Sequence, residues 1–312
     1  MRKKKYDLVT LTDVFGVSYN KEVLQLIKQG CKEVLNISEA DFERKFYKEA
    51  PPKKVKSNAH IGGNYRSSGG DGKSGRSYQT PTADALVDEW YRTRDPNWLY
   101  SHPEYFWEGL ACSFETSAPF VAVNLVKEFK YPRYDRHDAI DPLSLNWNIF
   151  DWGAGVGLTT LILAKSFSQS TVYYNELNVE QVTLFKWLLQ KSGLTNVEII
   201  YDLEQLPPLD LLVGIEIVEH FQEPMTFLRP LLDKVKTGGL FAHSSYWESE
   251  TKMPTLGHFR TYNFDGDIRH VDKNRDIYTG FRKAMDREKW EFLNWQPFQK
   301  KPRFYRKGEK NV

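Results

Sequence analysis

The chain has 312 residues, of which 40% are hydrophobic and 27% charged, a composition typical of a globular protein with one large domain or two smaller ones. The formal net charge of +2 neither predicts nor excludes nucleic acid as a partner, because a basic face can occur on a near-neutral protein. No segment approaches the ~18 apolar residues of a membrane span, so we expect no membrane association. Cys31 and Cys112 are too few for a disulfide framework, which favours a reducing cytoplasm.

Residues 1–140 are predicted to form a mostly helical N-terminal region. Asn20 and Ser38 are expected to cap two helices. Gly and Ser dominate residues 57–80, which indicates a long loop, either a basic lid or an unstructured linker. The chain from Thr82 to Phe129 is expected to be helical and is rich in aromatic residues. Helical core is the favoured interpretation of these aromatics, and a stacking surface for a flat substrate is the alternative.

Residues 141–312 are predicted to form a second domain in which strands and helices alternate. The expected strands are 146–152, 171–176, 196–202, 209–216 and 240–247, and the expected helices are 157–167, 179–193 and 225–239. Asn178 and Gly193 are expected to cap the ends of the second of these helices. Such alternation predicts a parallel α/β sheet with helices on both faces. Residues 290–295 and 302–307 are candidate closing strands.

A glycine-rich turn follows the first of these strands. The sequence "FDWGAGVGLTTL" contains Asp151, Gly153, Gly155 and Gly157. A dinucleotide fingerprint would need a further glycine where Leu158 stands. The spacing D-x-G-x-G-x-G instead resembles the first motif of the class I S-adenosylmethionine (SAM)-dependent methyltransferases. The resemblance implies that the glycines keep Cβ atoms away from the methionine part of bound SAM.

Four later segments strengthen the resemblance. Glu176 ends the second strand and is expected to accept hydrogen bonds from the ribose hydroxyls, and Asp202 resembles the acid that contacts the adenine amino group. The sequences "LDLLVGIEIVEHFQEPMTFL" and "KVKTGGLF" resemble the later motifs of the family. The resemblance covers about residues 145–250 and implies the Rossmann-like SAM-methyltransferase fold, with SAM as cofactor. It also implies that the N-terminal region supplies acceptor-site or lid elements.

The segment after the fourth strand carries the candidate catalytic residues. We assign Glu216, Glu219 and His220 to catalysis, and Glu216 also to cofactor binding. His220 is the candidate general base, although it could instead cap the following helix. The spacing i, i+3, i+4 could converge on a divalent ion. Because His243 and His258 are only candidates for a further ligand, we expect no metal.

The acceptor is the least determined part of the prediction. The Asn/Asp-Pro-Pro-aromatic motif of base-amine methyltransferases is absent after the fourth strand, and so is the Pro-Cys pair of cytosine C5 enzymes. O-methylation of a small or medium acceptor, a metabolite or nucleoside, is therefore favoured. A metal-assisted RNA ribose 2′-O-methyltransferase and a non-catalytic SAM-binding or scaffold module remain the alternatives.

Overall fold

The structure is a computed structural model that describes most of the second half of the chain and separate stretches of the first half. The described residues are 9–18, 20–46, 89–90, 92–93, 95–103, 105–115, 145–245, 259, 261–270, 274–293 and 303–308. The segment 57–80, the expected domain boundary near residue 140, the expected helix after residue 115 and His258 lie outside these ranges. Within them, no helix is long and apolar enough to cross a membrane.

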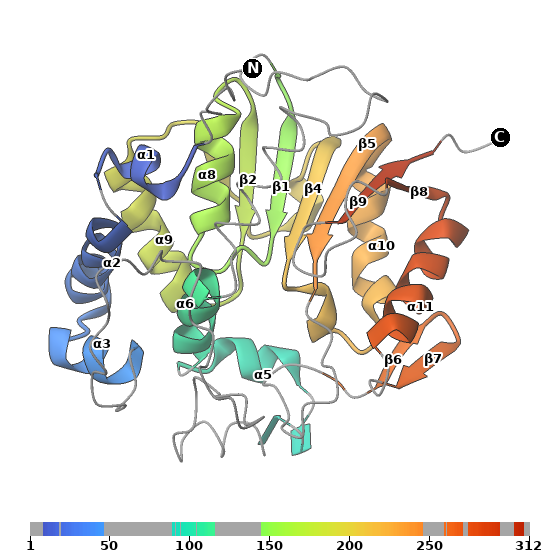
Figure 1. Ribbon diagram of the computed structural model, residues 1–312, viewed down its shortest axis with the longest axis horizontal. Helices are drawn as coiled ribbons and strands as arrows, with labels where there is room; N and C mark the ends of the chain where they lie inside the picture. Colours follow the sequence, from blue (N-terminus) through green and yellow to red (C-terminus); the bar gives the residue numbers. More distant parts are fainter. Residues whose placement is uncertain are drawn as a thin grey trace, which may run out of the picture.

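A seven-stranded sheet in the order β3-β2-β1-β4-β5-β9-β8 forms the centre of the fold (Figure 1). Its strands are β1 (Asn148–Trp152), β2 (Thr171–Asn175), β3 (Val197–Ile199), β4 (Leu209–Ile215), β5 (Val235–Ser244), β8 (Trp290–Leu293) and β9 (Arg303–Lys307). Strands β1 to β5 pair in parallel, whereas β9 is antiparallel to both β5 and β8. This arrangement confirms the predicted α/β sheet and both closing strands.

Helices connect the strands of the sheet: α8 (Leu158–Ser166), α9 (Val179–Ser192), α10 (Pro224–Lys234) and α11 (Asn274–Arg287). Both ends of α9 are capped as the sequence predicts. The Asn178 Oδ1 atom accepts a hydrogen bond from the backbone N–H of Gln181 at 3.0 Å. At the other end, Gly193 adopts a φ of 66°, a left-handed conformation that glycine tolerates without a steric penalty.

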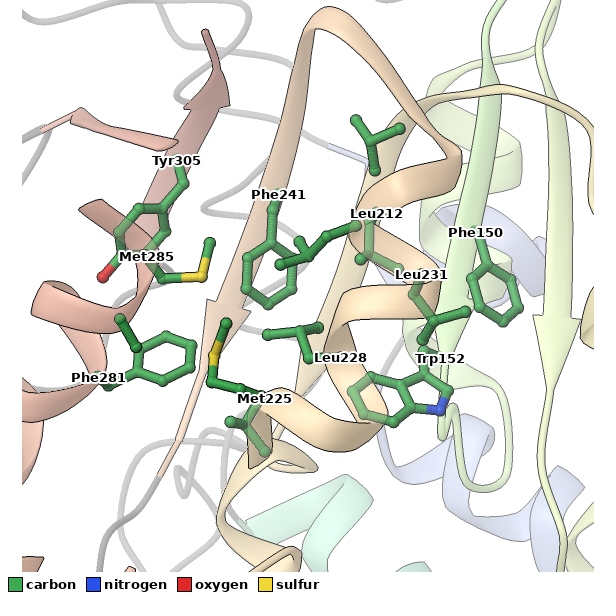
Figure 2. Packing of buried hydrophobic residues seen from close by; sticks show 14 of the residues in the cluster. Phe150, Trp152, Leu212, Met225, Leu228, Leu231, Phe241, Phe281, Met285 and Tyr305 are labelled. Atoms are coloured by element: carbon green, nitrogen blue, oxygen red, sulfur yellow. The ribbon is translucent and has the colours of Figure 1, made fainter. Parts of the chain in front are cut away.

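Both faces of the sheet are buried under helices. On the face covered by α10 and α11, Phe150, Leu212 and Phe241 of the sheet share one cluster with Leu228 and Met285 of the helices (Figure 2). On the opposite face, α8 packs against β1 and β4 in a second cluster. Burying one such side chain stabilises the fold by about 1.5–3 kcal/mol, so these clusters hold the strand ends in place.

The N-terminal helices pack on the same body. They are α1 (Leu11–Phe15), α2 (Asn20–Leu35), α3 (Glu39–Phe46), α5 (Pro96–Ser101) and α6 (Tyr105–Glu115). Val23 and Ile27 of α2 share a buried cluster with Leu184 and Leu188 of α9. Helices α5 and α6 lie near the edge at which the parallel strands end (Figure 1). Part of the N-terminal region is therefore placed beside the carboxyl ends of the strands.

Two parts of the second half differ from the prediction. The expected helix over residues 225–239 ends at Lys234, and the next residues begin β5. Gly238 has a φ of 78°, which an α-helix does not accommodate, and Val235 pairs with Leu209 of β4. The hairpin of β6 (Thr261–Phe264) and β7 (Asp267–His270) and helix α11 were not anticipated.

Candidate functional site

The candidate residues lie at or near the carboxyl ends of the parallel strands β1 to β5. Strand β1 lies between β2 and β4, so the connections from β1 and β4 leave toward opposite sides of the sheet. In open α/β sheets, ligands bind outside the strand ends at such a switch point. Two groups of residues meet there, and we call them the glycine loop (residues 153–157) and the β4–β5 corner (Glu216, Glu219, His220 and His243).

The glycine loop is anchored on the neighbouring strand β2. The Ala154 N–H donates to the Asn175 carbonyl at 2.9 Å, and the Tyr174 hydroxyl donates to the Gly155 carbonyl at 2.6 Å. The Gly155 N–H donates to Glu176 Oε2 at 2.9 Å. Three hydrogen bonds therefore fix the loop relative to the end of β2.

All three glycines of the motif need the left-handed backbone conformation, with φ values of 61° at Gly153, 59° at Gly155 and 76° at Gly157. A Cβ atom at Gly153 would lie 2.1 Å from Ile217 Cδ1, and one at Gly157 would lie 2.0 Å from Phe185 Cδ2. The loop thus packs closely against its own protein at these two positions. Contact with Ile217 and Phe185 is by itself enough to exclude a side chain at these positions.

Asp151 lies beneath the loop and is buried, with 1% of its surface exposed. Its Oδ2 atom accepts a hydrogen bond from the Thr160 hydroxyl of α8 at 2.6 Å. Burial raises the pKa of Asp151 from its ordinary 3.8 to about 7, against the lowering effect of the Thr160 bond. The Asp151 side chain therefore connects β1 to α8, and its carboxylate is buried beneath the loop.

Glu176 directly follows β2 and is held by backbone donors. Its Oε1 atom accepts from the N–H groups of Leu177 at 2.7 Å and Asn178 at 2.9 Å, and Oε2 accepts from Gly155. Burial raises the pKa of Glu176, whereas the three N–H groups lower it. The carboxylate is therefore oriented before any ligand binds.

Asp202 lies three residues beyond Ile199, where β3 ends, in an exposed position. Its Oδ1 atom accepts from the Glu204 N–H at 2.9 Å and caps a single 3₁₀ turn, η2 (Leu203–Gln205). The ring of the neighbouring Tyr201 is 65% exposed. One carboxylate oxygen of Asp202 is therefore used to cap this turn. Asp202 lies at the same edge of the sheet as Glu176.

Glu216 follows β4 with a φ of 52°, which is unusual for a residue other than glycine. Its N–H donates to the Ser244 carbonyl at 2.8 Å, and its Oε1 accepts from the Ser244 hydroxyl at 2.7 Å. Glu216 is thus tied to the end of β5 through both backbone and side chain.

Glu219 and His220 lie in a 3₁₀ turn, η3 (Val218–His220). Glu219 is fully buried, whereas His220 is half-buried, with its ring centroid 6.0 Å from that of Tyr100. Helix α10 begins only at Pro224, with Glu223 as its N-cap. His220 therefore does not cap that helix.

Glu216, Glu219 and His220 are not arranged as a metal-ligand set in the described part of the chain. The backbone of Glu216 is in the left-handed conformation, and the residues from Val218 to His220 form a 3₁₀ turn. The i, i+3, i+4 spacing therefore lacks the α-helical geometry that the prediction assumed. Among the described residues, no three His, Cys, Asp or Glu side chains lie together in positions suited to a metal ion. His243 is buried on β5.

Tyr100 belongs to this site, although sequence reasoning did not single it out. Its ring is 6% exposed, and its hydroxyl has no hydrogen-bond partner among the described residues. Burial raises the pKa of Tyr100 well above its usual range, and the charges of Glu176 and Glu219 raise it further. The hydroxyl is therefore a protonated donor near both carboxylates. The aromatic run from Trp90 to Trp107 was the available signal, and most of it is core.

Gln181 is a second residue that the prediction missed. It lies in the first turn of α9, is 1% exposed, and its Nε2 has no partner in the described part of the chain. A Cβ at Gly155 would lie 3.3 Å from Gln181 Oε1 and 3.4 Å from Ser113 Oγ of α6. Helix α6 and Gln181 thus border the glycine loop.

The strand order and the glycine turn after β1 define a fold of the Rossmann-like kind found in class I SAM-dependent methyltransferases. The parallel strands lie in the order β3-β2-β1-β4-β5, which is the doubly wound pattern. Strand β9 pairs antiparallel with β5. The fold class expected from the sequence is confirmed, with α8 on one face and α10 and α11 on the other.

No protein-family model and no curated protein matches the chain. Solved structures similar to it include a SAM-dependent methyltransferase from Aquifex aeolicus, with 18% identity, a TM-score of 0.41, and 70% of this chain and 96% of that one covered. A SAM-dependent O-methyltransferase from Thermotoga maritima matches with 14% identity and a TM-score of 0.39, covering 73% and 72% of the two chains. A precorrin-6y C5,15-methyltransferase from Geobacter metallireducens matches with 14% identity and a TM-score of 0.35, covering 49% and 69%.

Proposed function

We propose that the chain is a SAM-dependent methyltransferase that transfers a methyl group to an oxygen of a small or medium acceptor, such as a metabolite or a nucleoside. The observation that carries this proposal is Glu176. Its carboxylate lies at the switch point of the sheet, and the N–H groups of Gly155, Leu177 and Asn178 orient it. A pre-oriented carboxylate beside a glycine turn suits the ribose of an adenosine.

The number of hydrogen bonds that the Glu176 carboxylate can accept refines this assignment. A carboxylate offers about four lone-pair positions, and three of them are occupied by backbone donors. The remaining position on Oε2 suits one ribose hydroxyl, which is one fewer than the sequence suggested. Asp202 would accept from the adenine amino group, and Tyr100 adds a hydroxyl donor near Glu176.

The other residues of the motif have different roles in this proposal. Asp151 acts as a positioning residue, because its carboxylate is buried against Thr160. Gly153 and Gly157 let the loop pack against Ile217 and Phe185. The loop would then present its backbone to the methionine part of the cofactor.

The β4–β5 corner would hold the acceptor. Bound SAM supplies an electrophilic methyl group on its sulfonium. His220 accepts the proton of the acceptor hydroxyl as general base, and Glu216 fixes the corner through Ser244. The half-buried position of His220 beside the Tyr100 ring supports this role, because a residue of intermediate exposure keeps part of its surface open to a ligand.

Release and identification of bound ligand test the proposal first. Mass spectrometry of the purified full chain should reveal SAM or its demethylated product. In calorimetry, Glu176→Ala should weaken SAM binding roughly ten-fold or more, because a hydrogen bond to a charged group is worth ~1.5–3 kcal/mol. Glu180→Ala, in the first turn of α9, is the matched control and should bind SAM as the wild type does.

Two outcomes would favour the alternatives. SAM binding without turnover on any acceptor would indicate a non-catalytic binding module. Activity that disappears with EDTA and returns with Mg²⁺ or Mn²⁺ would indicate the metal-assisted enzyme, with RNA ribose as the first acceptor to test. Unchanged SAM affinity in a folded Glu176→Ala variant would contradict the proposed site itself.

A further inference from the structure

A cation and an imidazole lie side by side at the carboxyl end of β5. Arg303 is the first residue of β9 and pairs with His243 of β5, and residues directly opposite in an antiparallel pair share a face of the sheet. Helix α11 covers this face with Tyr278, whose hydroxyl donates to the Ser245 carbonyl at 2.7 Å. The cluster is therefore built from three separate segments of the chain.

Arg303 has a desolvated positive charge. Its guanidinium carbon lies 3.3 Å from the centroid of the Tyr278 ring, and burial lowers the pKa of Arg303. No described carboxylate lies within 4.0 Å of it; the ion pairs in the described part of the chain involve other arginines and lysines. A partly buried cation without an anion is unfavourable, because burial removes its hydration without compensation.

His243 offers a second unsatisfied group next to this cation. The residue is fully buried, its Nδ1 lies 3.2 Å from the Ser245 hydroxyl, and its Nε2 has no partner among the described residues. Burial lowers the pKa of His243 well below its usual range, and the charge of Arg303 lowers it further. The ring is therefore neutral, and when Ser245 donates to Nδ1 the proton is on Nε2, which then acts as a donor.

We propose that Arg303 and His243 bind an anionic group, a phosphate or a carboxylate, of the methyl acceptor. This inference rests on the proposed methyltransferase function and specifies its substrate class. Arg303 supplies the charge and a planar set of N–H donors suited to such oxyanions. The Nε2–H of His243 supplies one further hydrogen bond.

The location relates the anion to the site of transfer. Ser245 directly follows Ser244, which binds Glu216, and β9 lies two strands from β4. Neighbouring strands are ~4.8 Å apart, so an anion at Arg303 lies about 10 Å from the end of β4. An acceptor of nucleotide size, with its anionic group at one end and the reactive hydroxyl at the other, spans that separation.

The inference can be tested on the full chain without knowing the acceptor. Inorganic phosphate and acetate are titrated separately, with ring signals of histidine followed by NMR and the Tm measured in parallel. We expect saturable shifts of the His243 ring with one or both anions, and at least ten-fold weaker binding in Arg303→Met. Arg303→Met should also raise the Tm of the free protein by a few degrees, because it removes an unpaired buried charge.

Arg306→Met is the matched control, because alternation along β9 places Arg306 on the opposite face of the sheet. It should retain anion binding, and it corrects for the general stabilisation of proteins by phosphate. A response to phosphate alone indicates a phosphorylated acceptor, and a response to acetate alone indicates a carboxylic acid. The inference is overturned if the wild type shows no saturable response to either anion, or if Arg303→Met and Arg306→Met weaken anion binding equally. Binding of an oligonucleotide but of neither small anion would also overturn it.

Failure of this inference can be separated from failure of the proposed function. SAM affinity is measured by calorimetry in the same three proteins and should not change. A protein that binds SAM but neither anion refutes only the anion site. A protein that binds an anion through Arg303 but does not bind SAM refutes the proposed methyltransferase.

Discussion

The glycine loop and the β4–β5 corner meet at one edge of the sheet, but they are held in different ways. The loop is fixed through its own backbone groups, which bond to the Asn175 carbonyl, the Tyr174 hydroxyl and the Glu176 carboxylate, all within about 25 residues of Asp151. The corner is joined by side chains from distant segments: the Ser244 hydroxyl binds Glu216, and the Tyr262 hydroxyl donates to the Glu219 carbonyl at 2.9 Å. The glycine loop and the β4–β5 corner, the two halves of the site, therefore differ in which substitutions they tolerate.

A site made of backbone can keep one ligand while side chains change, whereas a site made of side chains changes its ligand with each substitution. This difference agrees with the function we propose, in which the loop binds the constant partner, the cofactor, and the corner binds the variable partner, the acceptor. Substitutions in the loop should thus alter stability and cofactor binding, and substitutions in the corner should alter turnover.

The largest expected effect is on turnover in the corner. His220→Ala should slow methyl transfer ~10²–10⁴-fold, because a general base contributes that much, while calorimetry shows unchanged SAM affinity. His270→Ala, on the exposed hairpin strand β7, is the control and should leave the rate unchanged. A His220→Ala enzyme that retains its rate but binds SAM poorly would reverse the assignment of the two halves.

The second prediction concerns the stability of the loop half at different pH values. Because the pKa of Asp151 is raised from 3.8 to about 7, its contribution to stability is complete below about pH 4 and is lost as the pH rises to about 7. Relative to Asp151→Asn, the wild type should therefore lose up to about 4 kcal/mol of unfolding free energy across this range. Urea unfolding measures the difference; a constant offset would show that the carboxylate is solvated.

The structure of the glycine loop and its surroundings could be predicted from sequence because its determinants are local. Glycine spacing, a strand-end acid and the caps of α9 are each set by residues a few positions apart, and strands β1 to β5 follow from regular alternation. The reasons for the glycines were less visible, because Ile217 and Phe185 approach the loop only in the folded chain.

The corner could not be predicted to the same depth, because its geometry depends on tertiary contacts. Nothing near Tyr100 in the sequence indicates that its ring lies beside His220. Likewise, Arg303 and His243 become neighbours only through the pairing of β5 with β9. The β6–β7 hairpin did carry a local signal, since Asp265-Gly266 with φ values of 58° and 84° is a typical hairpin turn.

The third prediction separates close packing from backbone conformation in the loop. Gly157 and Gly193 have similar φ values of 76° and 66°, but a Cβ would meet Phe185 at 2.0 Å at the first position and nothing within 4 Å at the second. Gly193→Ala should cost about 1 kcal/mol for the left-handed conformation. Gly157→Ala should cost roughly 3 kcal/mol, because overpacking adds to it. Equal losses in urea unfolding would mean that Phe185 moves aside freely.

The smallest expected effect tests where the two halves touch. The Tyr100 hydroxyl is buried without a partner among the described residues, so it costs stability in the free protein, and Tyr100→Phe should leave the Tm unchanged or raise it. If the hydroxyl donates to bound ligand, the same variant should lose about 0.5–1.5 kcal/mol of binding or transition-state stabilisation, a two- to ten-fold effect.

Comparing affinity with rate then assigns Tyr100 to one half. Weaker SAM binding in Tyr100→Phe would place its hydroxyl with Glu176, whereas a lower rate at unchanged SAM affinity would place it with His220. Tyr100→Leu is the control for the ring, which packs edge-on against Tyr105 at 4.9 Å, and it should lower the Tm. If Tyr100→Phe changes neither affinity nor rate, Tyr100 is only a packing residue, and the two halves meet without it.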